Sequence, residues 1–169
     1  MKEIIAEPVT IIINQMLNTG IFPESLKISK VIPLYKKDDD TVISNYRPIS
    51  LLSSISKIFE KAVLLQITNY FDNNHLINVS QYGFRKQHST ELASLQLVDY
   101  LSFEMDSGKT LLNIYLDLSK AFDTLNHSIL IDKLKLYGLT GISLYLFESY
   151  LHNRTQICNM IQRFQIART

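Results

Sequence analysis

The sequence has little of several features that mark whole classes of protein. Its 169 residues include one cysteine, Cys158, so an internal disulfide is excluded. A reducing compartment fits this, and we expect an intracellular protein of the cytoplasm or nucleus. No apolar run approaches the ~20 residues that a membrane-spanning helix needs, and the N-terminus lacks a signal-peptide pattern. We therefore expect no membrane partner.

A strong charge of one sign is also missing. The 17 Lys and Arg residues nearly balance the 16 Asp and Glu residues, which leaves a net charge of +1. Many nucleic-acid-binding domains are strongly basic, so the overall charge does not by itself indicate nucleic acid. The cations are nevertheless concentrated in residues 27–61. The four histidines lie far apart and share no metal-ligand spacing.

Enough apolar residues are present, 46% of the chain, to form a sizeable core. Helical periodicity together with capping and stop residues predicts five helices. These are expected at Glu7–Gly20, Ser56–Phe71, Thr90–Met105, Ser128–Tyr137 and Ile142–His152. Long helices in mixed order with strands indicate an α/β or α+β fold.

Two apolar runs have the length of strands. Lys30–Lys36 contains Pro33, which predicts an edge strand because proline cannot donate to a ladder. Thr110–Leu116 lacks clean alternation, so it predicts a central strand that is covered on both faces.

The most informative stretch is Asn113–His127, NIYLDLSKAFDTLNH, in which the predicted central strand ends on Asp117. A carboxylate at the end of a buried strand can hold a divalent metal, and Mg²⁺ prefers oxygen ligands of this kind. From the residues alone, an aspartate that caps the following turn is the commoner explanation. The acidic run Asp38–Asp40 also looks like a metal cluster. Adjacent carboxylates repel one another and no structured element holds them, so we interpret this run as a solvated turn.

Several motifs occur in a fixed order along the chain. They are Lys30–Lys37 (KVIPLYKK), Asn45–Leu52 (NYRPISLL), Lys57–Lys61 (KIFEK), Gln81–Arg85 (QYGFR), Ser89-Thr90, the D-L-S-K-A-F-D-x-x-x-H run from Asp117, and Tyr150–Gln156 (YLHNRTQ). Together they resemble the reverse transcriptases of non-LTR retrotransposons, the jockey-like LINE elements, from about residue 8 to about residue 156.

The resemblance implies an α+β fold of the right-hand polymerase type. Fingers would occupy residues 1–80 and the N-terminal half of the palm residues 81–156, followed by a divergent tail at 157–169. The fingers would be helical with a β-hairpin built around Lys30–Pro48, and the palm would be an antiparallel sheet backed by helices. The chain would stop before the catalytic Asp-Asp hairpin of the palm.

The resemblance also implies roles for residues of the palm motif. Asp117 matches the first catalytic aspartate, which ligands both Mg²⁺ ions, and the backbone carbonyl of Leu118 would face a metal. Phe122 matches an aromatic gate beneath the incoming sugar, where a rigid ring would clash with a ribose 2′-hydroxyl. A plain core phenylalanine is the alternative at this position.

Three cations match residues that hold the incoming nucleotide. Arg47 matches an arginine that grips the triphosphate, for which a guanidinium is suited. Lys36 matches a lysine on the same triphosphate, with Lys37 as the alternate. Ordinary surface cations are the alternative for all of them.

A third group matches residues near the template and primer. It consists of Gln81, Gly83, Arg85, Arg154 and Gln156. Gly83 is expected to supply an unusual backbone angle beside the substrate. Contacts of the cations with phosphates would be independent of sequence and sensitive to salt.

The acids after Asp117 bear on activity. The family supplies two further aspartates from an aromatic-x-Asp-Asp hairpin, whereas this chain has only Asp123, Asp132 and Glu148 after Asp117, none in a pair. Two-metal phosphoryl transfer needs more than one carboxylate, so we expect a fragment of an RNA-directed DNA polymerase that is inactive alone.

The implied partners are an RNA template, a DNA primer and a dNTP. In the full-length parent they would include the remaining palm, the thumb and the endonuclease domain common in these elements. A non-catalytic nucleic-acid-binding remnant and a non-functional relic of a mobile element are the alternatives to a polymerase fragment.

Overall fold

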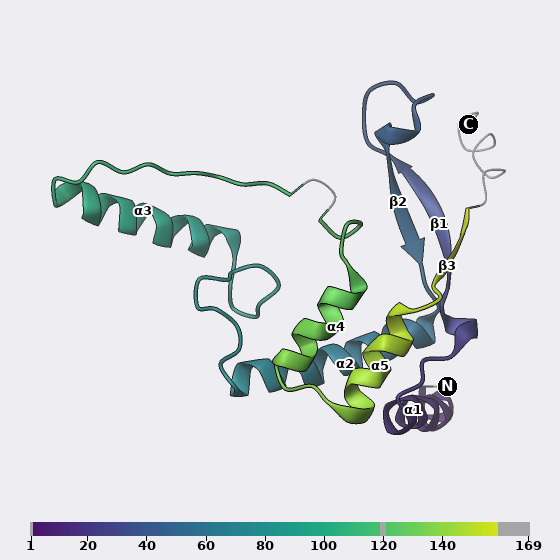
Figure 1. The fold of residues 1–169 in the computed structure, drawn as a ribbon. Coiled ribbons are helices and arrows are strands. Elements are labelled where there is room, and N and C mark those ends of the chain that lie inside the picture. Colours follow the sequence, from purple (N-terminus) through teal and green to yellow (C-terminus); the bar gives the residue numbers. More distant parts are fainter. Residues whose placement is uncertain (1, 119–120, 159–169) are drawn as a thin grey trace. The chain divides into compact units, whose positions relative to one another are not determined.

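The computed structural model describes residues 2–118 and 121–158 (Figure 1). Within these ranges the helices are α1 (Lys2–Thr19), α2 (Ser54–Asn73), α3 (Thr90–Asp106), α4 (His127–Leu136) and α5 (Gly141–Leu151), and the strands are β1 (Ile28–Tyr35), β2 (Tyr46–Leu51) and β3 (Thr155–Cys158). Single 3₁₀ turns occur at Glu24–Leu26 and Ile43–Asn45. This mixture of helices and strands confirms the α+β class.

The chain divides into two compact units. Unit 1 combines the residues up to Gln66 with those from Asn126 onward, and unit 2 is Ile67–Leu125. The buried apolar side chains of the described residues all belong to unit 1. Helix α3 of unit 2 has no buried residue.

The core of unit 1 lies where α1, α2 and α5 meet around Phe22. The ring of Phe22 is 1% exposed, and its centroid lies 5.1 Å from that of Phe59 and 5.0 Å from that of Tyr150. Ile13 and Met16 of α1 and Leu146 of α5 complete the cluster. Burial of large aromatic and aliphatic side chains is the main term that stabilises such a unit.

Local signals set the ends of several helices as expected. The Ser89 hydroxyl accepts the N–H of Leu92 at 3.2 Å and begins α3. At the end of α1, Gly20 adopts φ 69° and donates its N–H to the Met16 carbonyl at 2.9 Å. The predicted start of this helix at Glu7-Pro8 is wrong, because α1 begins at Lys2 and contains Pro8. Proline inside a helix removes one backbone hydrogen bond, but its φ is compatible with the helix, which here continues through Pro8 at that cost.

The sheet has the order β2-β1-β3. β1 and β2 form the predicted antiparallel hairpin, in which Pro33 is opposite Pro48. β3 runs parallel to β1 (Figure 1) and pairs with its residues Ile28–Val31. β1 is therefore the middle strand, and the prediction of an edge strand at Lys30–Lys36 is wrong, because its second partner is distant in the sequence. The described residues form this mixed sheet and not the expected antiparallel palm sheet.

Residues 109–118 form no strand, so the prediction of a central strand at Thr110–Leu116 is wrong. Leu112 is 85% exposed and Leu116 is 90% exposed, whereas both were expected to be covered. A strand requires neighbours that pair with its backbone, and the part of the chain that the structure describes supplies none to this segment. The apolar pattern of a segment does not reveal whether a partner strand is present.

Candidate functional site

Two candidate cations, Lys36 and Arg47, lie at the end of the β1–β2 hairpin where the loop joins the two strands. Arg47 stands opposite Leu34, and the Lys36 N–H donates to the Asn45 carbonyl at 2.9 Å, which continues the ladder by one pair. Because side chains alternate along a strand, Lys36 shares a face with Leu34 and Arg47. Lys36 and Arg47 are thus diagonal neighbours on the two strands, and the backbones of such neighbours are separated by about 7–8 Å. Both side chains are exposed, so one polyanion can contact both, while Lys37 lies in the bend that follows β1.

Hydrogen bonds hold the loop that joins the two strands. The Tyr35 and Tyr46 rings lie 5.4 Å apart, and their hydroxyls donate to the carbonyls of Asp38 and Asp40. The Asp39 carboxylate accepts the Thr41 hydroxyl at 2.7 Å and the Thr41 N–H at 2.9 Å, which lowers the pKa of Asp39. All three aspartates are exposed, in agreement with a solvated turn.

In unit 2, Asp117 and Leu118 are exposed on the extended segment after α3. Phe122 is 82% exposed, so the alternative of a core phenylalanine is wrong. Its ring meets the Phe84 ring edge-on, with centroids 6.1 Å apart. The unusual backbone angle expected at Gly83 is found one residue later, at Phe84 (φ 62°), and a Cβ on Gly83 would meet nothing within 4 Å.

Two of the other candidates in unit 2 contact the backbone of their own loop. Nη1 of Arg85 donates to the carbonyls of Asn78 and Gln81, each at 3.4 Å. Nε2 of Gln81 donates to the Gly83 carbonyl at 3.4 Å. A guanidinium has five N–H donors, so Arg85 can stabilise this loop and still contact a phosphate.

The implied Mg²⁺ has a weak donor set in this chain. Magnesium sites use six oxygens, commonly one or two carboxylates with substrate phosphates and waters. Asp117 is the one carboxylate that the family pattern assigns here, and residues 2–118 and 121–158 hold no group of three His, Cys, Asp or Glu suited to a metal. These residues do not fit a resident metal by themselves, so no step of the chemistry is assigned to one.

Arg154 and Gln156 lie at the start of β3 in unit 1. The Arg154 guanidinium carbon is 4.5 Å from the centroid of the Tyr150 ring, and Nη1 donates to the Tyr150 carbonyl at 3.2 Å. Gln156 is opposite Ser29 of β1. The Tyr150 hydroxyl donates to Oε1 of Glu60 at 2.7 Å. Sequence reasoning missed Tyr150 and Glu60 as site residues, although both lie in motifs that it identified.

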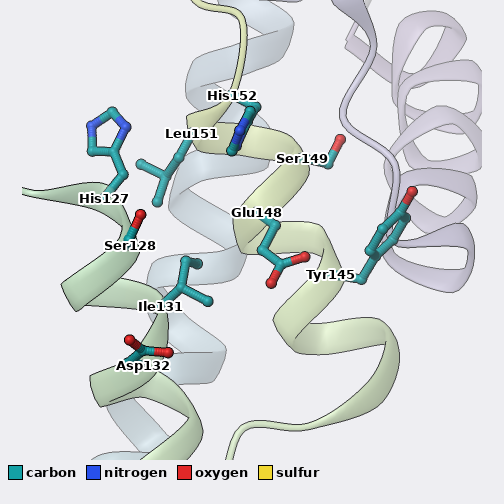
Figure 2. A pocket seen from close by; sticks show the side chains of 9 residues that line it. All are labelled: His127, Ser128, Ile131, Asp132, Tyr145, Glu148, Ser149, Leu151 and His152. Atoms are coloured by element: carbon teal, nitrogen blue, oxygen red, sulfur yellow. The ribbon is translucent and has the colours of Figure 1, made fainter.

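A pocket of about 450 Å³ lies between α4 and α5. Figure 2 shows Glu148 of α5 and Asp132 of α4 along it, with His127 and His152 at one end. None of the candidate site residues lines it. Its size therefore does not identify it as the site of the chemistry.

Among the described residues, no helix is long and apolar enough to cross a membrane.

Comparisons with known proteins give a consistent result. The family model described as reverse transcriptase (RNA-dependent DNA polymerase) matches residues 34–169. Over 147 residues the chain is 33% identical to the RNA-directed DNA polymerase from mobile element jockey of Drosophila melanogaster, covering 86% of this chain and 16% of that protein. It is 28% identical over 166 residues to the probable RNA-directed DNA polymerase from transposon BS of the same species, covering 94% and 17%. The probable polymerase from transposon X-element, also of Drosophila melanogaster, is 30% identical over 147 residues, covering 86% and 16%. The chain thus spans about a sixth of the length of these relatives.

Proposed function

Since this chain belongs to the reverse transcriptase family, we propose that it carries the nucleotide-gripping half of an RNA-directed DNA polymerase site and is inactive alone. The complete enzyme would add dNTPs to a primer on an RNA template by two-metal phosphoryl transfer. In this proposal the fingers occupy residues 1–80, the partial palm residues 81–156 and a divergent tail residues 157–169.

The placement of Lys36 and Arg47 is the observation that carries the proposal. Two exposed cations from neighbouring strands share one face at the end of a hairpin whose loop is held by hydrogen bonds. A guanidinium can contact phosphate oxygens with two N–H groups, and an ammonium beside it adds a point charge. Together they can hold the triphosphate of an incoming dNTP.

The remaining roles are assigned by position in the family motifs. Asp117, with the Leu118 carbonyl, would contribute to Mg²⁺ binding once further carboxylates and nucleotide phosphates are present. The exposure of the Phe122 ring supports a role as the gate against a ribose 2′-hydroxyl. Template and primer contacts are proposed for Gln81, Gly83, Arg85, Arg154 and Gln156.

Equilibrium binding of a radiolabelled dNTP in the presence of Mg²⁺ tests the triphosphate grip. Arg47→Ala and Lys36→Ala should each weaken binding about tenfold, which corresponds to about 1.4 kcal/mol for a lost charged contact. Lys37→Ala removes the same charge from the bend after β1, outside the paired part of the hairpin, and should change binding less than about twofold. Equal losses for all three variants would show that bulk charge alone attracts the nucleotide, and would contradict the proposal.

A second candidate function is nucleic-acid binding without catalysis. It is favoured by Arg154, which is held on an aromatic ring next to β3. An RNA–DNA hybrid should then bind with an affinity that falls as salt rises. Absence of salt-dependent binding at low ionic strength would remove this candidate.

A further inference from the structure

The Arg154 guanidinium contacts both the ring and the backbone carbonyl of Tyr150. Its guanidinium carbon lies 4.5 Å from the centroid of the Tyr150 ring, which is within the range of a cation–π contact. Its Nη1 also donates to the Tyr150 carbonyl at 3.2 Å. This hydrogen bond uses one of five N–H donors, so the guanidinium can still bind a phosphate. Within the described residues the ion pairs are Lys27–Glu24 and Lys109–Glu104, so the charge of Arg154 is not neutralised there by a carboxylate.

The Tyr150 ring is itself fixed on several sides. The Phe22 ring meets it edge-on with centroids 5.0 Å apart, and the Phe59 ring lies at 6.4 Å in a stacked orientation. Its hydroxyl donates to Oε1 of Glu60 at 2.7 Å, across from α5 to α2. Burial, and then the Glu60 carboxylate, raise the pKa of Tyr150 to about 12, so the hydroxyl remains a donor at physiological pH.

Hydrogen bonds also fix the backbone of Thr155, which follows Arg154. The Thr155 N–H donates to the Lys27 carbonyl, and the Ser29 hydroxyl donates to the Thr155 carbonyl, both at 3.3 Å. Thr155 is opposite Ile28, which begins β1, whereas Lys36 follows the other end of that strand. Eight residues of strand separate the two ends by roughly 25 Å. Arg154 is therefore too far from Lys36 and Arg47 to share one triphosphate with them, and a longer polyanion suits it.

We propose that Tyr150 is a positioning residue that presents the Arg154 guanidinium to a phosphate of the template–primer backbone, with the Phe22 and Phe59 rings fixing the orientation of the Tyr150 ring. This inference rests on the proposed nucleic-acid contact of Arg154 and goes beyond it.

The test is a salt series with the 169-residue chain and a fluorescent RNA–DNA hybrid. Each phosphate contact contributes about 0.9 to the slope of log K against log salt concentration. Arg154→Ala should therefore reduce the slope by about one contact. Tyr150→Leu, which changes no charge, should reduce it by the same amount, whereas Tyr150→Phe keeps the ring and should retain the wild-type slope. Lys135→Ala, which removes an exposed cation of α4, is the matched charge control and should also retain it.

The outcomes separate this inference from the function on which it rests. A wild-type chain that fails to bind the hybrid at low salt would remove the nucleic-acid contact and the inference together. A wild-type chain that binds, with an unchanged slope for Tyr150→Leu, would overturn the inference alone.

If Tyr150→Leu does not fold, as judged by circular dichroism, an NMR titration of the wild-type chain tests the proposal instead. The Arg154 Nε–H signal, assigned by its loss in Arg154→Ala, should shift together with the Tyr150 ring signals when hybrid is added. Signals that stay in place on saturation with hybrid would overturn the proposal.

Discussion

Gly20 lies against the backbone of Ile142 so closely that a Cβ on Gly20 would stand 2.9 Å from the Ile142 carbonyl oxygen. Gly20 also adopts φ 69°, a conformation that residues with a Cβ rarely take. The end of α1 thus contacts the beginning of α5 through backbone, at a place where two independent physical reasons require glycine. The same turn leads directly to Phe22, whose N–H donates to the Ser149 hydroxyl at 3.0 Å.

Gly20→Ala should lower the free energy of unfolding by about 2–3 kcal/mol, because left-handed strain and a backbone clash add together. Urea denaturation followed by circular dichroism measures this. Gly141→Ala is the matched control: Gly141 has φ 56°, but a Cβ there would meet nothing within 4 Å. That variant should lose only the strain, about 1 kcal/mol, and equal losses for the two variants would contradict the close approach.

Two apolar residues of α2 should respond very differently to truncation. Phe59 is 2% exposed and contacts the Phe22 ring, whereas Leu65 is 45% exposed. Phe59→Ala should destabilise the chain by about 3–5 kcal/mol through lost burial and a cavity. Leu65→Ala should change stability by no more than about 0.5 kcal/mol. Thermal melts of both variants provide the comparison, and a large loss for Leu65→Ala would show that this face of α2 is covered in solution.

The burial of Tyr150, together with its hydrogen bond to Glu60, predicts a dependence of stability on alkaline pH. The pKa of Tyr150 is about 12 in the folded chain and about 10 when unfolded, so its protonated form is favoured by folding. The resulting stabilisation is fully present below pH 10 and is lost as pH rises through 12. Tyr150→Phe should be less stable than wild type by about 1 kcal/mol at pH 8, and this difference should shrink above pH 10. Urea midpoints of the two proteins at pH 8, 10 and 11.5 measure it. A difference between the two urea midpoints that stays constant over that pH range would contradict the raised pKa of Tyr150.

The 169-residue chain should not extend a DNA primer on an RNA template in the presence of Mg²⁺. Catalytic groups that act as a unit fail together, and no acidic pair follows Asp117 in the sequence. A primer-extension gel is the measurement, with Asp117→Ala as the background control. Template-dependent incorporation by the wild-type chain that disappears in Asp117→Ala would sink this prediction.

Features encoded by neighbouring residues were predicted well from the sequence. The bounds of α3 follow from Ser89, which caps the first turn, and from the Ser107-Gly108 stop. The family resemblance implied the hairpin around Lys30–Pro48, and the pairing of β1 with β2 confirms it. The ordered motifs around Asp117 and Phe122 identified the family, which the comparison confirmed.

Features that depend on distant residues were predicted poorly. Thr110–Leu116 has the composition of a central strand, but strand formation requires a partner that local pattern does not reveal. The parallel pairing of β3 with β1 joins residues 127 positions apart (155 − 28), which no periodicity indicates. Likewise the contact of Glu60 with Tyr150 spans 90 positions, so their role emerges only from packing.

The exposed segment 109–118 also affects how long this protein would survive in a cell. Proteases bind their substrates as extended strands, and exposed segments without secondary structure are preferred sites of cleavage. This segment already has that form, with Leu112, Ile114 and Leu116 accessible to a protease subsite. Cleavage there needs no prior global unfolding, so turnover would follow protease access and not global stability. It would also separate Lys36 and Arg47 from Asp117, so that the residues proposed to hold the nucleotide and the metal would lie on two different fragments.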